Sequence, residues 1–239
     1  MERPIILKAH EVRGILDGRQ TQLRRIIKPQ PDLFFHRGDW QPDGMIWKGR
    51  RTHADQSGLP SQCPFGQVGD RLWARETWGI NVGQECCGYG QPDGYGGHEC
   101  CGCPRTEQYP VYKSDADAET LDGKWKSSTQ MPRYFARILF EIVSVRVERL
   151  QDISDSDATA EGCQVKEGVV VKDGKQVAAP VYWFDEYYIE ATPQWAFRKL
   201  WDFVNVGRLC WSNDKVIEPN SWLANPWVWV VEFKRVGAQ

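Results

Sequence analysis

The sequence predicts an α+β fold, a small mixed β-barrel flanked by short helices and interrupted by loop insertions. Three observations lead to this prediction. Short segments in which apolar and polar residues alternate, as in half-buried strands, recur along the chain. A few short helical segments stand between them, without the regular strand–helix alternation of a doubly wound sheet. Gly- and Pro-rich stretches interrupt the series, which indicates insertions into a compact core.

The composition is that of an ordinary folded protein with no overall charge bias. The 239 residues suit one elaborated domain or two small ones, and 41% of them are hydrophobic. Lys and Arg number 30 against 32 Asp and Glu, a formal net charge of -2. No global positive field attracts the protein to nucleic acid, so any such binding must rest on a local patch.

The N-terminal sequence MERPIILKAHEVRG lacks the long apolar region and cleavage site of a signal peptide. No run of about 18 apolar residues occurs, so we expect no membrane span. We therefore expect a cytoplasmic protein in a reducing compartment. The chain has eight cysteines, and in such a compartment clustered cysteines are more often metal ligands than disulfides.

The first strands and helix are short. Residues 8–18 predict a helix with its apolar side chains on one face and Gly18 as its stop. The following QLRRIIKP predicts a strand that ends at Pro29. The segment VGDRLWARETW, residues 68–78, returns to strand character after a turn.

The segment ARILFEIVSVRVERL contains the clearest strand. Ile138, Phe140 and Ile142 share one face, and the alternation then continues from Val143 instead. A slip of one residue indicates a β-bulge, which bends a strand around a small barrel.

Two capped helices and a last strand complete the pattern. ISDSDATAEG predicts a helix with Ser154 as N-cap and Gly162 as its stop. TPQWAFRKLWDFVN predicts an amphipathic helix capped by Thr192. NPWVWVVEFKRV alternates strictly and predicts a strand with a heavily aromatic side.

We interpret the chain as a single domain, 1–239, with insertions at about 30–62, 79–130 and 164–190. The second insertion is rich in Cys and Gly and has too little apolar periodicity to fold by packing alone. The third contains a hairpin about Asp173 and Gly174.

Several of these pieces, in this order, resemble the ASCH family, whose fold is PUA-like. The resembling stretches cover somewhat under half the chain: ILDGRQTQLRRIIKP, GQVGDRLWARETW, MPRYFARILFEIVSVRVERLQDISDSDATAEG, AFRKLWDFVN and NPWVWVVEFKRV. The ETW and NPWVWVVEF motifs are most similar to those of the larger ASCH proteins of bacteriophages and prophages. The resemblance thus implies a bacterial host cell.

The resemblance also implies a compact barrel with a cleft where the GR-x-T turn meets it. Relatives in the wider PUA-like class bind RNA or read modified bases. One branch of ASCH proteins hydrolyses the acyl group of N4-acetylated cytidine with a Lys, a Thr and a Glu. The matching positions here are Gln20, Leu23 and Glu161, and Thr21 supplies a displaced hydroxyl. The resemblance therefore implies Thr21 and Glu161 as the catalytic candidates, with two of the family's three groups replaced.

A basic stretch, DGRQTQLRRIIKP, is the main candidate for contact with nucleic acid. Arginine forks suit phosphates and base edges, and a turn followed by a strand can present several together. The alternative is a solvated surface whose arginines pair with carboxylates. Arg25 is a separate case, which we expect to pair with a carboxylate such as Glu161 or Glu76 inside the cleft, in a binding or a structural role. With Arg133 extending the patch, the nucleic-acid-binding candidates are Arg19, Gln20, Thr21, Arg24, Arg25, Lys28 and Arg133.

The Cys-rich segment ECCGYGQPDGYGGHECCGCP predicts a structural zinc site. The C-x₂-C spacing lets two thiolates reach one tetrahedral Zn²⁺, and the metal would order a segment that lacks a core. The alternatives are a flexible loop with free thiols, or disulfides. Cys63, Cys163 and Cys210 are isolated and are expected to be packed residues. The metal-ligand candidates are Cys86, Cys87, His98, Cys100 and Cys103.

Three functions are compatible with these observations. The first is a PUA-like protein that binds RNA, or another single-stranded or modified nucleic acid, through a basic cleft. The second is an amidohydrolase acting on N4-acylated cytosine nucleosides. The third is a phage-encoded module that binds a host protein through residues 79–130.

Overall fold

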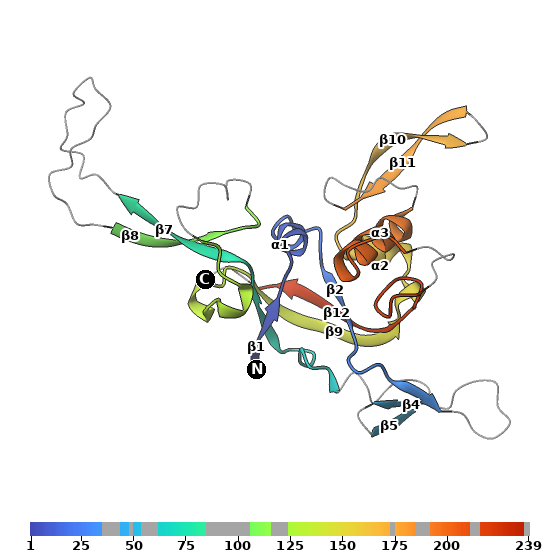
Figure 1. The fold of residues 1–239 in the computed structure, drawn as a ribbon, viewed down its shortest axis with the longest axis horizontal. Helices are drawn as coiled ribbons and strands as arrows, with labels where there is room; N and C mark the ends of the chain where they lie inside the picture. The colour runs from blue at the N-terminus through green and yellow to red at the C-terminus, as the bar shows by residue number, and fades with distance from the viewer. Residues whose placement is uncertain are drawn as a thin grey trace.

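The protein is an α+β molecule with several sheets and few helices in its described part (Figure 1). The computed structural model describes residues 1–34, 44–47, 50–53, 62–84, 106–115, 124–172, 175–184, 192–210 and 216–236. None of the helices in these ranges is long and apolar enough to cross a bilayer.

A five-stranded sheet forms the centre of the molecule, in the order β1-β6-β9-β12-β2. Strand β1 pairs parallel with β6, and the other neighbours are antiparallel. The strands are β1 (Glu2–Ile6), β2 (Gln22–Ile26), β6 (Arg71–Arg75), β9 (Leu139–Arg149) and β12 (Trp227–Arg235).

The prediction of a closed barrel is wrong for the described strands, because β1 and β2 stand at opposite ends of the strand order and do not pair. Helix α1 (Ala9–Leu16) connects these two edge strands. A side chain bridges them in place of backbone pairing, since Arg25 Nη2 on β2 donates to the Ile6 carbonyl on β1 at 3.3 Å. The sheet therefore keeps a free edge along β2.

Each face of the central sheet is buried by different helices. The first core, beneath α1, contains Trp229 and Val231 of β12. The second core contains Val228 and Val230 of the same strand, packed against helices α2 (Asp155–Ala160) and α3 (Pro193–Asn205). The predicted alternation of β12 is thus confirmed, with both of its faces buried.

The predicted β-bulge is confirmed in β9. Glu232 is opposite Ser144, whereas Phe233 is opposite Ile142, so Val143 has no partner in the ladder. Val143 is half exposed, and the core positions change phase across it. Three predicted helix ends are confirmed as well: Gly18 has a φ of 72° after α1, and the side chains of Ser154 and Thr192 accept N-cap hydrogen bonds.

Smaller strand groups lie within the predicted insertions and project from the central sheet (Figure 1). Strands β10 and β11 pair up to Lys172 and Lys175, which confirms the predicted hairpin. These groups are β3 (Asp32–Phe34) with β4 (Gly44–Trp47) and β5 (Arg50–His53), β7 (Trp78–Gln84) with β8 (Thr106–Tyr112), and β10 (Gln164–Lys172) with β11 (Lys175–Trp183). Three 3-10 helices complete the described elements: η3 (Ser128–Gln130), η4 (Arg133–Phe135) and η5 (Leu150–Asp152).

Candidate functional site

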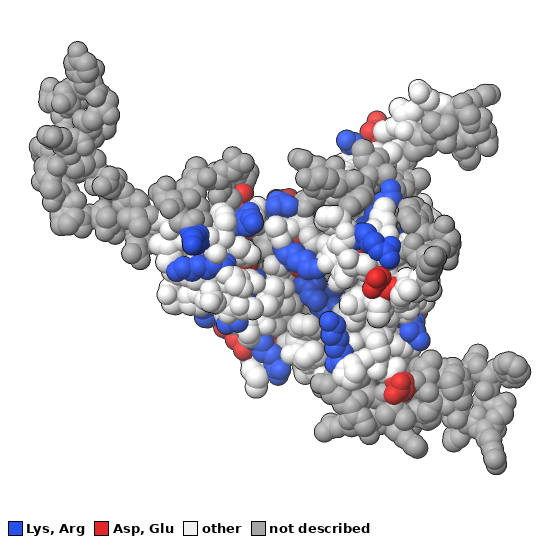
Figure 2. Space-filling view, viewed as in Figure 1, with Lys and Arg blue, Asp and Glu red and all other residues white. Residues whose placement is uncertain are grey.

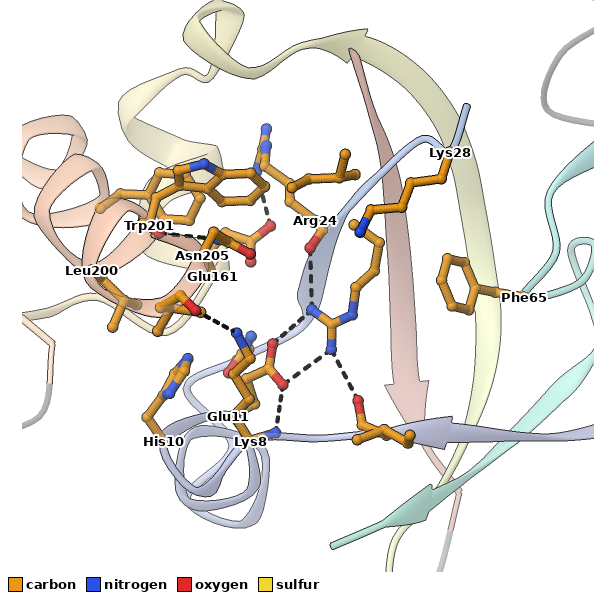
Figure 3. Close-up of a pocket in the computed structure, with 16 residues that line it drawn as sticks. Lys8, His10, Glu11, Arg24, Lys28, Phe65, Glu161, Leu200, Trp201 and Asn205 are labelled. Atoms are coloured by element: carbon orange, nitrogen blue, oxygen red, sulfur yellow. Dashed lines mark hydrogen bonds and ion pairs between the residues drawn. The ribbon is translucent and has the colours of Figure 1, made fainter. Parts of the chain in front are cut away.

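A cavity of about 360 Å³ lies where the free edge of β2 faces helix α3 and the start of α1 (Figure 3). We call it the first cavity. Its volume is within the range of small-molecule sites in proteins. Among the described strands β2 pairs with β12 alone, so its other edge is left for side chains and a ligand.

The backbone of β2 contributes directly to the first cavity. Thr21 and Ile27 bond to β12, so by alternation Gln22, Arg24 and Ile26 direct their N–H and C=O groups to the free edge. Side chains already satisfy two of these carbonyls. Gln20 Nε2 donates to Gln22 O at 3.0 Å, and Arg25 Nη1 donates to Arg24 O at 3.1 Å. Of these three edge residues, Arg24 and Ile26 line the cavity.

An apolar wall stands opposite this edge. Helix α3 supplies it, because the i, i+3, i+4, i+7 spacing of its apolar residues places them on one face. Trp201 is held in orientation by its Nε1, which donates to Asn220 O at 2.8 Å. Phe65 lines the cavity as well (Figure 3). The apolar lining from α3 consists of Phe197, Leu200, Trp201 and Val204.

Arg24 belongs to a buried ion-pair network that α2 and β9 complete. Its guanidinium side chain has no exposed surface and contacts Glu161 at 3.0 Å, Asp157 at 3.2 Å, and Glu148. Arg146 joins the same network, with Asp157 at 2.8 Å and Glu148 at 3.1 Å. Because three carboxylates already hold it, Arg24 is a structural cation rather than one available to a phosphate.

Glu161 is the most unusual titratable group of the first cavity. Arg24 Nη1 and Gln22 Nε2 both donate to its Oε1, at 3.0 and 3.4 Å, and no donor in the described part of the chain contacts Oε2. Burial raises the pKa of Glu161 to about 7, although Arg24, Arg25 and Gln22 oppose the shift. A carboxyl group of this kind can accept or donate a proton near neutral pH.

Arg25 and Glu11 form a second ion pair that ties α1 to β2. Arg25 Nη1 and Nη2 reach the two oxygens of Glu11 at 2.7 and 3.0 Å, and the Lys8 backbone N–H donates to the same carboxylate at 2.8 Å. Burial opposes the charge on Glu11, but Arg25 outweighs it and lowers the pKa of this carboxyl. Arg25 therefore pairs with Glu11, and the predicted pairing with Glu161 or Glu76 is wrong.

Two lysines supply the available positive charge of the first cavity. Lys28 is exposed, and neither it nor Lys8 forms an ion pair with a described residue. Lys8 Nζ donates to Val204 O at 3.3 Å across the gap between α1 and α3, and burial lowers its pKa. Figure 2 shows Lys and Arg side chains gathered in a band over the region of α1 and β2.

The structure brings together five of the residues predicted to bind nucleic acid or catalyse: Gln20, Arg24, Arg25, Lys28 and Glu161 all line the first cavity. It does not bring in the remaining three. Arg19 donates to Asp17 and to Gly162 O, and Arg133 pairs with Glu2. Thr21 is exposed and outside the lining.

Gln20 and Leu23, the residues that match the catalytic Lys and Thr of the ASCH branch, have different surroundings. Leu23 is fully buried in the first core and does not line the cavity. Gln20 lines it and is held between two glycines. A Cβ at Gly14 would lie 2.9 Å from Gln20 Oε1 and 3.1 Å from its Cβ, and one at Gly162 would lie 3.3 Å from the Gln20 Cβ. The close approach explains a glycine inside α1, where it weakens a helix.

Several lining residues were missed by sequence reasoning. Phe65 lies in a loop and gave no sequence signal. Lys8 and His10 belong to a predicted helix whose relation to β2 was unknown. Glu76 pairs with Arg137 instead of Arg25: Arg137 reaches its two oxygens at 2.9 and 2.8 Å.

The predicted zinc ligands Cys86, Cys87, His98, Cys100 and Cys103 lie outside the described residues, so the zinc site stays a prediction. The described residues contain no group of three or more His, Cys, Asp or Glu placed to hold a metal. The three isolated cysteines, Cys63, Cys163 and Cys210, are buried and form no disulfide among the described residues, as expected.

Comparison with known proteins returned no matching family model, no matching curated protein and no matching solved structure. The resemblance to ASCH proteins therefore stays a prediction from the sequence motifs.

Proposed function

We propose that the protein binds single-stranded nucleic acid, RNA or a strand with a modified base, and holds one nucleotide unit in the first cavity. One observation carries the proposal. A cavity of about 360 Å³ combines an apolar and aromatic wall, an edge of backbone amides, and two lysines that form no ion pair with a described residue. Unpaired bases are commonly held by this combination of stacking, edge hydrogen bonds and phosphate contacts.

Each part of a nucleotide has a matching group in the cavity. Phe65 and the α3 wall offer apolar surface to the face of a base. Glu161 Oε2 and the β2 edge offer hydrogen-bonding groups to its rim, as acidic side chains do to an exocyclic amino group. Lys8 and Lys28 offer charge to the phosphate.

Fluorescence anisotropy with labelled 12-nucleotide single strands, in RNA and DNA versions of each homopolymer and one mixed sequence, tests the proposal. We expect binding by the wild type and a loss of about fivefold in affinity for Lys28→Ala, the effect of one phosphate contact. Lys234→Ala is the matched control, since Lys234 is an exposed lysine that pairs with Glu141 and lines no part of the cavity. Equal affinities of wild type and Lys28→Ala for every strand would count against the proposal.

A second candidate, hydrolysis of N4-acylated cytosine nucleosides, has one observation in its favour. Burial holds the pKa of Glu161 at about 7 inside the cavity, as a general base requires. Neither Thr21 nor Leu23 lines the cavity, so a water molecule would have to act as the nucleophile. Incubation with N4-acetylcytidine decides between the candidates. Release of cytidine by the wild type and not by Glu161→Gln would support hydrolysis, and no release by the wild type would exclude it.

A further inference from the structure

A second cavity, of about 300 Å³, adjoins the first. Both cavities are lined by Ile6 and Lys8, at the end of β1 and the start of α1, so these two residues form their common wall. Ile6 is 47% exposed there, an apolar side chain turned to solvent between the two spaces. Leu7 and Ala9 also line the second cavity, and its remaining residues follow β6 and β8 or belong to η3: Glu76, Thr77, Lys113, Ser114 and Ser128.

The second cavity carries net positive charge. Lys113 is exposed and has no ion pair in the described part of the chain. Arg137 holds both oxygens of Glu76, to which Ser114 Oγ donates at 2.8 Å, and it also pairs with Asp115. Lys8, Lys113 and Arg137 therefore outnumber these two carboxylates. The hydroxyls of Thr77 and Ser128 line the same space. Lysine and hydroxyl groups without a resident carboxylate partner suit a phosphate.

Three lysines therefore follow one another along the two cavities. Lys28 lines the first cavity, Lys8 lines both, and Lys113 lines the second, and none of them forms an ion pair with a described residue. The neighbouring arginines differ, since Arg24, Arg25 and Arg137 are all held by carboxylates. Lysines thus supply the available charge along this line.

We propose that the two cavities form one groove that holds at least two successive nucleotide units of a single strand. The base of one unit lies in the first cavity, the linking phosphate lies near Lys8, and the second unit lies in the second cavity with a phosphate near Lys113. Ile6, exposed at the junction, contacts the sugar between the two units. The inference rests on the proposed function and adds the length and position of the bound strand.

Isothermal calorimetry with the four ribonucleoside 5′-monophosphates and the sixteen 5′-phosphorylated ribodinucleotides tests the groove. We expect the tightest dinucleotide to bind about tenfold more tightly than the tightest mononucleotide, as a second stacked base and phosphate would provide. Lys113→Ala should remove most of this gain and leave mononucleotide binding unchanged. Lys113→Arg should restore it, and Lys234→Ala should behave as the wild type. The deoxyribonucleotide versions show whether the groove requires the 2′-hydroxyl.

Two outcomes would overturn the groove while leaving the first cavity as a mononucleotide site. One is equal affinity for mono- and dinucleotides, and the other is a gain that Lys113→Ala does not change. A third outcome, in which neither the mononucleotides, the dinucleotides nor the 12-nucleotide strands bind the wild type, would overturn the proposed function itself and the groove with it.

Discussion

Arg24 and Arg25 are adjacent in the chain but serve different parts of the fold. Alternation along β2 turns Arg24 toward α2, where it meets Glu161, and turns Arg25 toward α1, where it meets Glu11. The sequence predicted a concentration of positive charge here and left two uses open, ligand contact or ion pairing. The partners lie 137 and 14 positions away, so the sequence alone could not assign them.

Replacement of Arg24 tests its structural role. In Arg24→Ala the carboxylates of Glu148, Asp157 and Glu161 lose a shared cation in a buried site. We expect the free energy of unfolding to fall by about 3–5 kcal/mol, as when one partner of a buried ion pair is removed. Lys28→Ala, at an exposed residue four positions on, should stay within about 0.5 kcal/mol of the wild type. Urea denaturation measures both, and similar losses in the two variants would contradict this division of roles.

The raised pKa of Glu161 makes the free energy of unfolding depend on pH. The fold raises the pKa of this carboxyl from 4.5 to about 7, mainly through burial. Its contribution to stability is therefore fully present below the unfolded-state pKa and is lost as the pH rises through 7. We expect the difference in unfolding free energy between wild type and Glu161→Gln to fall by up to about 3 kcal/mol from pH 4.5 to pH 8.

The control for this measurement is Glu141→Gln. The hydrogen bond from Lys234 lowers the pKa of Glu141 from its ordinary value of 4.5, so this group titrates below the range from pH 5 to pH 8. The difference between wild type and Glu141→Gln should stay constant from pH 5 to pH 8. A difference for Glu161→Gln that is equally constant would show that Glu161 is ionised across the range.

At the scale of elements, the short helix α2 positions two of the carboxylates that hold Arg24. It has six residues, yet it places Asp157 and, at its C-cap, Glu161 against Arg24. The Ser154 side chain caps it by accepting from the Asp157 N–H at 3.1 Å. We expect Ser154→Ala to lower the free energy of unfolding by about 1 kcal/mol and Ser154→Asp to retain most of it. Equal stability of the alanine variant and the wild type in thermal denaturation would show that packing alone positions α2.

The sequence predicted the β-bulge and the helix ends because each depends on a few neighbouring residues. The bulge at Val143 follows from a phase slip, and the helix ends at Gly18, Ser154 and Thr192 follow from capping chemistry. Closure of the sheet depends on whether two distant edges meet, and here the Arg25 side chain links them by bonding to the Ile6 carbonyl while it pairs with Glu11 of α1. No pattern within β1 or β2 predicts that outcome, although the free edge of β2 is what makes the first cavity.

At the scale of the whole molecule, positive and negative charges are nearly equal in number, but the paired arginines and the cavity lysines lie in different places. The chain has a net charge of -2, and many of its arginines are neutralised by carboxylates. The lysines of the two adjoining cavities stand apart from these pairs. Composition argues against a global attraction to nucleic acid, and the fold shows which basic residues form no ion pair with the described carboxylates.

The lysines of the two cavities determine how strongly we expect the affinity for a single strand to depend on salt. Three lysines without ion pairs among the described residues, Lys8, Lys28 and Lys113, line the two cavities. For a single strand each phosphate contact contributes about -0.7 to the slope of log K against log salt, so the wild type should give about -2. Anisotropy titrations of a 12-nucleotide strand between 50 and 200 mM salt, roughly the range over which such slopes are defined, measure it. Lys28→Ala and Lys113→Ala should each reduce the slope by about 0.7, whereas Lys234→Ala should not change it. A slope near zero in the wild type would mean that the strand is held by its bases alone, and a slope unchanged in both lysine variants would place the phosphates elsewhere on the protein.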